Sequence, residues 1–332
     1  MTPIEFTILG NSGIKVSKVC LGTWAIGGWM WGGADDDNAI KTIHTALSKG
    51  INFIDTAPVY GFGHSEEIVG KAVSQYSARR EDIILATKVG LEWSEDGKVM
   101  RNSTRGRIEK EIEDSLKRLQ TDYIDLYQVH WPDTAVPFEE TATTLKSLLD
   151  SGKIRAVGVS NFSPAQMDEF KKYCPLHSVQ PPYNLFERAI DEDVRPYALE
   201  NGLAILAYGA ICRGLLSGKM SLDRKFIGDD LRQYDPKFQS PRFEQYLTAV
   251  DKLDSLAKTN YDKGVLALAL RWVLDRGAIA LWGARQPHQL DAVDSVFGWK
   301  INQEDMAAID TILGETVTDP VGPEFMAPPV RA

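Results

Sequence analysis

The stretch INFIDTAPVYG, residues 51–61, decides the fold. Its apolar run over residues 51–54, bounded by glycine and proline, indicates a buried parallel strand. Asp55 ends that strand, and Tyr60 lies in the loop that follows. Polar side chains at a strand end that faces a βα loop are where α/β enzymes carry their chemistry. On its own the pair also fits an aspartate that caps a turn and a half-buried tyrosine, so the rest of the chain decides between the two.

The length and composition of the chain argue against several classes of protein. Its 332 residues are 43% hydrophobic, enough for a sizeable core in one large domain or two ordinary ones. A net charge of -9 and a pI of about 5.2 argue against a nucleic-acid surface, which needs a basic field. No apolar run is long enough for a membrane span, and the N-terminus lacks the pattern of a signal peptide. We therefore expect no nucleic-acid or membrane partner.

The cysteines and the absence of ligand motifs limit the chemistry further. Cys20, Cys174 and Cys212 are unclustered and odd in number, which indicates free thiols in a reducing compartment and hence a cytoplasmic location. Neither CxxC nor HExxH occurs in the sequence, so we expect no structural or catalytic metal.

Short apolar runs alternate with helical patterns along most of the chain. The runs recur near residues 19, 51, 83, 123, 154, 177, 203 and 278. Helical periodicity occupies residues 36–49, 104–119, 139–150, 164–173 and 264–275. Eight strand–helix units in one series predict a parallel sheet closed into a (β/α)8 TIM barrel, as a single domain over residues 1–332. A doubly wound dinucleotide fold is disfavoured because its G-x-G-x-x-G motif is missing.

Three further segments are expected to lie outside this series. Residues 4–9 and 14–18 alternate around Gly10-Asn11-Ser12-Gly13, which predicts a hairpin that plugs the bottom of the barrel. The stretch from 208 to 244 is rich in glycine and charge and predicts a long functional loop on the top face. The ending VGPEFMAPPVRA predicts an ordered lid.

A titratable or hydrogen-bonding side chain closes most of the predicted strands. Besides Asp55, these residues are Lys88, His130, Ser160, Asn161, Gln180 and Tyr208. In a barrel the carboxyl ends of the strands converge on one face. Each residue alone has an ordinary structural explanation, such as a lysine that reaches solvent or a satisfied core histidine. Together they predict an active site.

The chain resembles the aldo-keto reductases along nearly its whole length. The motifs that carry the resemblance are LGTW at 21–24, D-T-A-x-x-Y at 55–60, LATK at 85–88, VHWP at 129–132, GVSNF at 158–162, Q-x-x-Y-N at 180–184 and GLLSGK at 214–219. GTWAIGGWMWGG and the ending DPVGPEFMAPP resemble the bacterial subgroup that reduces small aldehydes such as glyceraldehyde and methylglyoxal.

The resemblance places a catalytic tetrad on Asp55, Tyr60, Lys88 and His130. Carbonyl reduction needs a hydride from a nicotinamide and a proton for the developing alkoxide. A free tyrosine has a pKa near 10, and a neighbouring lysine ammonium is expected to bring it down by stabilising the phenolate. Asp55 would hold Lys88 by a buried ion pair, and His130 would orient the substrate carbonyl. Tyr60 is thus expected to be the general acid in reduction and the general base in alcohol oxidation.

The resemblance also implies a cofactor site. Ser160, Asn161 and Gln180 would bond the nicotinamide carboxamide, and Tyr208 would stack on its ring. The complete set of implied cofactor residues is Thr23, Trp24, Asp55, Ser160, Asn161, Gln180, Tyr208, Gly209, Ala210, Ile211, Cys212, Arg213, Gly214, Lys219, Arg232, Gly283, Ala284, Arg285 and Gln289.

Charged residues in two loops imply which nicotinamide cofactor binds. Arg213, Lys219 and Arg232 would fold over the pyrophosphate, and Arg285 would bond a 2′-phosphate as a planar fork. NADPH is therefore expected rather than NADH. The chain departs from many relatives in having Gly283 where they have lysine, and Gly209-Ala210 where they have Ser-Pro.

The substrate is expected to be a small carbonyl compound in an aromatic pocket. Its contacts would be Trp24, Tyr60, His130 and Trp131, with Trp29, Trp31 and Trp93 nearby and Phe325 and Met326 closing over them. A nucleotide-binding regulatory subunit of the same fold is the alternative function. A Schiff-base aldolase on Lys88 is disfavoured because that chemistry needs a lysine without a carboxylate partner. The physiological substrate, the direction of flux and the oligomeric state stay open.

Overall fold

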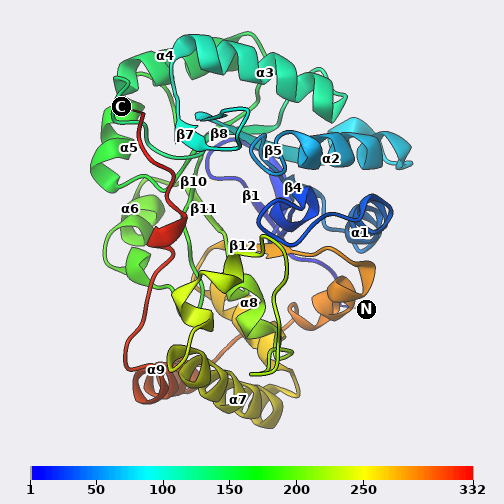
Figure 1. The fold of residues 1–332 in the computed structure, drawn as a ribbon, viewed down its shortest axis with the longest axis vertical. Coiled ribbons are helices and arrows are strands. Elements are labelled where there is room, and N and C mark those ends of the chain that lie inside the picture. The colour runs from blue at the N-terminus through cyan, green and yellow to red at the C-terminus, as the bar shows by residue number, and fades with distance from the viewer. Residues whose placement is uncertain (1, 332) are drawn as a thin grey trace.

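Eight short parallel strands close into a barrel in the computed structural model, which describes residues 2–331 (Figure 1). The barrel strands are β3 Val19–Gly22, β4 Phe53–Asp55, β5 Ile84–Val89, β8 Leu126–Val129, β9 Val157–Ser160, β10 Ser178–Gln180, β11 Ala204–Ala207 and β12 Ile279–Gly283. They pair in chain order, and β12 pairs with β3 to close the ring. The predicted (β/α)8 barrel is therefore confirmed.

Helices surround the barrel on its outside (Figure 1). They are α1 Asp36–Ser48, α2 His64–Gln75, α3 Arg105–Leu119, α4 Phe138–Asp150, α5 Pro164–Lys171, α6 Val194–Glu200, α7 Arg242–Tyr261, α8 Val265–Asp275 and α9 Gln303–Thr316. Local chemistry sets several helix starts. The Asp35 carboxylate accepts a hydrogen bond from the Asn38 backbone at α1, and Ser163 and Gln166 form a capping box at α5.

The ranges with helical periodicity correspond to α1, α3, α4, α5 and α8. The alternation of strand and helix implied α2 and α6 without giving their bounds, whereas α7 and α9 were not anticipated. A second short hairpin, β6 Leu91–Trp93 with β7 Val99–Arg101, was also missed. The stretch from 208 to 244 is a long loop that contains only short 3-10 turns before α7 begins.

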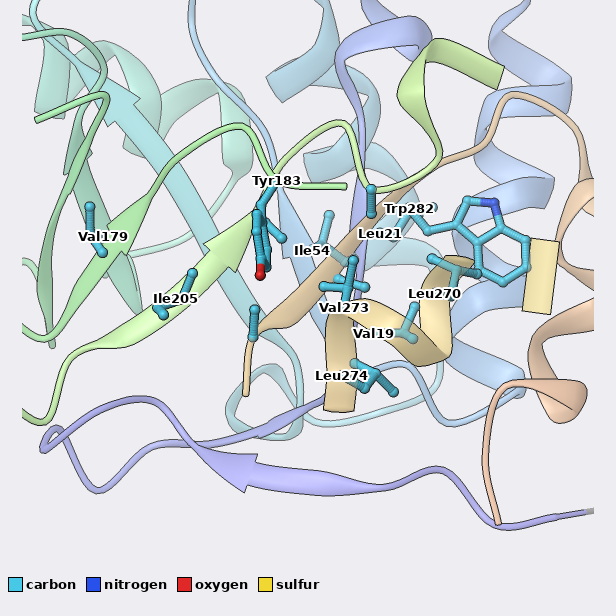
Figure 2. Packing of buried hydrophobic residues seen from close by; sticks show 14 of the residues in the cluster. Val19, Leu21, Ile54, Val179, Tyr183, Ile205, Leu270, Val273, Leu274 and Trp282 are labelled. Atoms are coloured by element: carbon cyan, nitrogen blue, oxygen red, sulfur yellow. The ribbon is translucent and has the colours of Figure 1, made fainter. Parts of the chain in front are cut away.

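Side chains alternate along each strand between the barrel interior and the helical layer. Ile54 points outward and belongs to the large apolar cluster between strands and helices. Figure 2 shows part of that cluster, where Leu270, Val273 and Leu274 of α8 lie among strand residues. Phe53 belongs instead to the interior cluster, and Asp55 shares its side of the strand. This alternation sends every second residue of the barrel strands into the interior.

The N-terminal hairpin closes the lower end of the barrel, as predicted. Its strands are β1 Phe6–Ile8 and β2 Lys15–Ser17, and Leu9, Ile14 and Val16 join the interior cluster. Gly10 has a φ of +53°, and a Cβ there would lie only 2.1 Å from the His177 carbonyl oxygen. The plug thus directs the open, solvent-accessible end of the barrel to the opposite face.

Candidate active site

The polar strand ends meet in one cavity of about 860 Å³. The predicted residues that line it are Thr23, Trp24, Asp55, Tyr60, His130, Trp131, Ser160, Asn161, Gln180, Tyr208, Gly209, Ile211, Arg213, Gly214, Arg232, Gly283, Arg285 and Gln289. Lys88 lies beneath the cavity floor and is completely buried. Ala210, Cys212 and Ala284 are buried outside the lining, and Lys219 is exposed.

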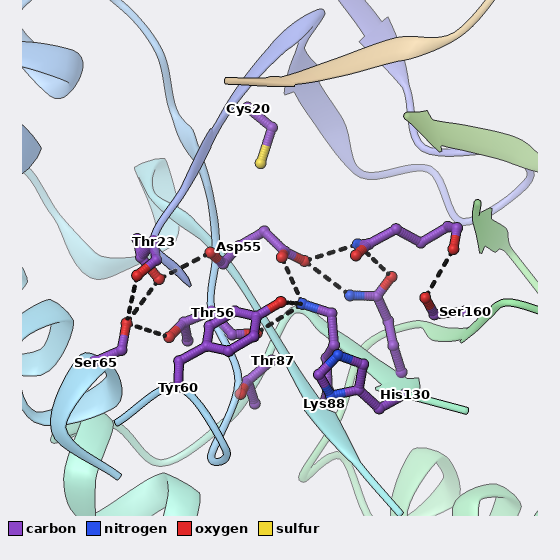
Figure 3. Close-up of polar contacts among 12 residues, drawn as sticks. Cys20, Thr23, Asp55, Thr56, Tyr60, Ser65, Thr87, Lys88, His130 and Ser160 are labelled. Carbon is purple, nitrogen blue, oxygen red and sulfur yellow. Dashed lines mark hydrogen bonds and ion pairs between the residues drawn. The ribbon is translucent and has the colours of Figure 1, made fainter. Parts of the chain in front are cut away.

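Lys88 joins the carboxylate and the phenol of the predicted tetrad (Figure 3). Its Nζ lies 2.6 Å from Asp55 Oδ1 and donates to the Tyr60 hydroxyl at 3.3 Å and to the Thr56 carbonyl at 3.0 Å. Three acceptors match the three hydrogens of an ammonium group. Burial opposes that charge, but Asp55 and Tyr60 outweigh it and raise the pKa of Lys88. Lys88 is therefore charged at neutral pH.

His130 directly follows β8 and faces the same phenol. The rings of Tyr60 and His130 meet edge to face, with centroids 5.7 Å apart and planes at 82°. Burial and the Lys88 charge hold the pKa of His130 well below its ordinary value. The imidazole is therefore neutral, and it can donate one hydrogen bond without adding a charge.

The acidity of Tyr60 differs from the sequence-based expectation. Burial raises the pKa of Tyr60 above 10, and the Lys88 ammonium, although it acts in the expected direction, offsets only part of that effect. The Asp55 carboxylate raises the Tyr60 pKa further. Sequence reasoning considered the neighbouring charge and omitted desolvation, which is the larger influence here.

A buried network that the sequence reasoning missed holds the other oxygen of Asp55. Gln128 Nε2 and Gln180 Nε2 donate to Asp55 Oδ2 at 3.0 and 2.9 Å. Thr23 Oγ1 donates to the Asp55 backbone carbonyl, and Ser65 Oγ reaches the Thr23 hydroxyl at 2.9 Å. A glutamine inside an otherwise apolar strand run was the only sequence signal for Gln128.

The residues predicted to hold a carboxamide form a continuous chain beside the tetrad. Asn161 Nδ2 donates to the His130 carbonyl and to Ser160 Oγ, both at 3.1 Å. The Tyr208 hydroxyl donates to Asn161 Oδ1 at 3.0 Å, which fixes the tyrosine ring over the cavity wall. The structure thus brings Ser160, Asn161, Gln180 and Tyr208 together as predicted.

The loop after β11 places its charges differently from the prediction. The Arg213 guanidinium is buried and paired with Asp235 at 2.5 Å and with Glu187 at 2.6 Å. Lys237 also pairs with Glu187. Arg213 therefore anchors the loop. The backbone N–H groups of the loop are then the donors available to a phosphate. Cys212, Arg213 and Gly214 are consecutive residues with positive φ.

Arg232 and Arg285 both carry protein partners at the cavity wall. Arg232 forms a two-pronged pair with Asp230 and lies over the Trp31 ring. Arg285 donates to the backbone carbonyls of Trp31, at 2.7 Å, and Gly33. Gln289 accepts from the Arg285 backbone N–H at 2.7 Å, so it shapes the local turn.

The segment from Met30 to Gly33 spans the cavity mouth between two loops. Asp229 accepts hydrogen bonds from the backbone of Met30 at 2.7 Å and of Gly32 at 2.9 Å. The Leu231 N–H donates to the Met30 carbonyl at 3.0 Å. With Arg285 on its other side, this segment, which we call the strap, links the loops that follow β3, β11 and β12.

The expected aromatic pocket is largely present. Trp24, Trp29, Trp31 and Trp131 line the cavity together with Phe325 and Met326 of the tail. Trp93 lies outside the lining and packs against Phe62. Arg101 fastens the tail through hydrogen bonds to the carbonyls of Pro328 and Pro329, so the ending is an ordered cover as predicted.

Between residues 2 and 331 no helix is long and apolar enough to cross a bilayer. The same residues contain no group of three or more histidine, cysteine or acidic side chains that could hold a metal ion.

Comparison with known proteins gives consistent matches over most of the chain. The description "Aldo/keto reductase family" matches residues 18–313. Aldo-keto reductase YhdN of Bacillus subtilis (strain 168) is 60% identical over 330 residues, which cover 99% of each protein. The NADH-specific methylglyoxal reductase of Escherichia coli (strain K12) is 34% identical over 90% of this chain and 95% of its own. A solved structure of a glycerol dehydrogenase from Gluconobacter oxydans matches with a TM-score of 0.87 and 55% identity, over 97% of this chain and 98% of that one.

Proposed function

The chain belongs to the aldo/keto reductase family, and from this premise we propose that it is an NADPH-dependent reductase of small aldehydes and ketones. Its substrates would be glyceraldehyde- or methylglyoxal-like carbonyls. The observation that carries the proposal is the placement of Lys88 Nζ, 2.6 Å from Asp55 and 3.3 Å from the Tyr60 hydroxyl at the cavity floor. That arrangement suits proton delivery to a substrate oxygen.

The residues of the cavity fit a nicotinamide dinucleotide. The cavity volume of about 860 Å³ lies within the range of small-molecule and cofactor sites. Ser160, Asn161 and Gln180 offer amide and hydroxyl groups suited to a carboxamide, and Tyr208 offers a ring face. The buried indole N–H of Trp31 has no acceptor among residues 2–331, which leaves it free for a polar group of a ligand. When bound, the cofactor supplies the hydride.

The protein's own residues would supply orientation and the proton. Neutral His130 donates a hydrogen bond to the substrate carbonyl and aligns it with Tyr60. The Tyr60 hydroxyl then protonates the oxygen as negative charge develops on it, and the Lys88 ammonium stabilises the phenolate that remains. Trp24, Trp131 and Phe325 exclude water from the reacting atoms.

Cofactor choice rests on Arg285 in this proposal. Its guanidinium is planar and lies at the cavity wall, where it suits a 2′-phosphate. The methylglyoxal reductase of Escherichia coli, named as NADH-specific, is the counter-example among the relatives. A cytoplasmic location is also proposed, and the three buried cysteines, all unpaired, support it.

The first experiment measures turnover with both cofactors. Purified protein is mixed with NADPH or NADH and with D,L-glyceraldehyde or methylglyoxal, and loss of the reduced nicotinamide signal is followed. Tyr60→Phe should lower kcat by about 10²- to 10⁴-fold while NADPH binding persists. Tyr76→Phe is the matched control, because Tyr76 packs on His44 outside the cavity lining.

The outcomes separate the candidate functions. Full activity of Tyr60→Phe would show that another group donates the proton. Tight NADPH binding by the wild type without turnover of any small carbonyl would favour the regulatory-subunit alternative. Faster turnover with NADH than with NADPH would overturn the assignment of Arg285.

A further inference from the structure

Gln128 is a polar residue of the barrel interior, and it lies directly above the interior apolar cluster. It lies on β8, is completely buried, and is in register with Lys88 of β5. Two residues earlier on the same face, Leu126 belongs to the interior apolar cluster. Burying an amide in such a place is costly unless its hydrogen bonds are made. The contacts of this amide therefore indicate its role.

Both ends of the Gln128 amide are used, and each serves a different partner. Its Nε2 donates to Asp55 Oδ2 at 3.0 Å. Its Oε1 accepts from Gln180 Nε2 at 3.2 Å. Gln180 Nε2 also donates to the same Asp55 oxygen at 2.9 Å. Gln128, Gln180 and Asp55 thus form a closed triangle of hydrogen bonds at the cavity floor.

The neighbouring strand leaves room for this side chain to cross the barrel. Gly158 of β9 is in register with Gln128. A Cβ at position 158 would lie 3.0 Å from Gln128 Cγ and 2.4 Å from Ser178 Oγ. Glycine at 158 therefore lets the glutamine extend from β8 towards β10, where Gln180 lies.

The triangle fixes which atom of the Gln180 amide is available to a ligand. Asp55 and Gln128 together accept both hydrogens of the Gln180 amide nitrogen. Gln180 lines the cavity, and its side-chain oxygen Oε1 has no protein donor among residues 2–331. The oxygen is thus the group left for a ligand N–H.

From this geometry we propose that Gln128 is a positioning residue that sets both the Asp55 carboxylate and the Gln180 amide. The inference rests on the proposed reductase function and deepens it. Gln128 acts on the proton-donor side through Asp55, which pairs with Lys88. It acts on the nicotinamide side through Gln180, which is held as an acceptor for the carboxamide N–H.

The test replaces the amide without changing the size of the side chain. Gln128→Met keeps an unbranched chain of similar length and removes the donor and the acceptor. Ser178→Ala is the matched control, because Ser178 is buried in the same interior layer but its hydroxyl has no partner in the described chain. Circular dichroism establishes that each variant is folded before any other measurement.

Two readouts report the two sides of the proposal. The Kd of NADPH, followed by quenching of tryptophan fluorescence, should rise about 3- to 10-fold in Gln128→Met because Gln180 is free to rotate. The pH at which alcohol oxidation reaches half its maximum rate should move upward by as much as about one unit. The direction follows because Asp55, having lost a donor, exerts a stronger negative field on Tyr60, and that field disfavours the phenolate.

The outcomes distinguish failure of the inference from failure of the function. If the wild type turns over carbonyls and folded Gln128→Met matches it in both readouts, the inference is overturned alone. If the wild type binds NADPH without turnover, the proposed reductase fails, and the comparison of Kd values still decides the role of Gln128 towards Gln180. A wild type that binds neither NADPH nor NADH overturns both. Equal effects in Gln128→Met and Ser178→Ala would show a packing role only.

Discussion

The buried pair between Lys88 and Asp55 gives a prediction whose size can be worked out. The side chains are 0% and 3% exposed, and their charged atoms are 2.6 Å apart. Asp55→Asn keeps the shape of the side chain but leaves the Lys88 ammonium without a carboxylate. Removing one partner of a buried pair costs about 3–5 kcal/mol. We therefore expect a large loss of stability from a substitution that removes only one charge.

The ability of lysine to release its proton limits that loss. Deprotonating Lys88 at pH 7, against its ordinary pKa of 10.5, costs about 5 kcal/mol, and at pH 9 it costs about 2 kcal/mol. In Asp55→Asn the unfolded state thus binds more protons than the folded state, so the stability of this variant rises with pH. In the wild type, pairing raises the pKa of Lys88, so its contribution is fully present below pH 10.5 and is lost only as pH rises through the folded-state value.

Thermal unfolding followed by circular dichroism is the assay. For 332 residues the entropy of unfolding is about 0.7 kcal/mol/K, so each kcal/mol shifts Tm by about 1.4 °C. Asp55→Asn should melt about 4–7 °C below the wild type at pH 7, and the gap should narrow by roughly half at pH 9. Lys88→Met completes a double-mutant cycle. The double variant should be less destabilised than the sum of the two single variants by about 3 kcal/mol.

Two results would refute this reasoning. Additivity of the two substitutions within about 0.5 kcal/mol would show that the charges do not depend on each other for stability. A difference in Tm between the wild type and Asp55→Asn that stays constant from pH 7 to pH 9 would show that Lys88 is not left as a buried, unpaired charge.

Three further predictions concern catalysis and cofactor binding. Because burial raises the pKa of Tyr60 above 10.0, alcohol oxidation, which needs the phenolate, should accelerate throughout pH 7–10, and a plateau below pH 8 would identify another base. Arg285→Ala should raise the Kd of NADPH about 10-fold and leave that of NADH nearly unchanged. An equal rise in the Kd of both cofactors would show that Arg285 only holds the strap. Asp229→Asn should release the strap and speed NADPH dissociation several-fold in stopped-flow measurements. Asp223→Asn, an exposed change in the same loop, should leave the dissociation rate unchanged. Identical dissociation rates in Asp229→Asn and the wild type would mean that the strap does not gate release.

The sequence predicted the barrel well because each strand carries its own signal. The apolar run at 51–54 and its counterparts correspond to the eight barrel strands in the described structure. The missed hairpin β6–β7 has no such signal, since each strand has three residues and Arg101 is held by the tail more than two hundred residues later. The helices α7 and α9 pack on each other outside the repeating unit, so the alternation of strand and helix gave no reason to expect them.

The candidate site divides in the same way between local and long-range information. Asp55, Lys88 and His130 stood out by residue type and position at strand ends, and the resemblance to the aldo-keto reductases joined them with Tyr60 as a tetrad. The partners of Arg213 could not be predicted, because Glu187 and Asp235 lie 26 and 22 residues away and meet it only in the folded loop. Sequence reasoning therefore assigned the guanidinium to a phosphate, whereas the fold had already neutralised it.

The buried polar side chains at the cavity floor, which are Asp55, Lys88, Gln128 and Gln180, behave as one unit. Buried polar groups must satisfy one another, and Asp55 does so with Lys88 on one oxygen and with Gln128 and Gln180 on the other. Neither glutamine can reorient without leaving a buried carboxylate oxygen short of a donor. The side of the cavity proposed to donate the proton and the side proposed to hold the carboxamide would consequently share one rigid support. A substitution on either side should therefore be felt on the other, with a change in the pH dependence of turnover accompanying a change in cofactor affinity.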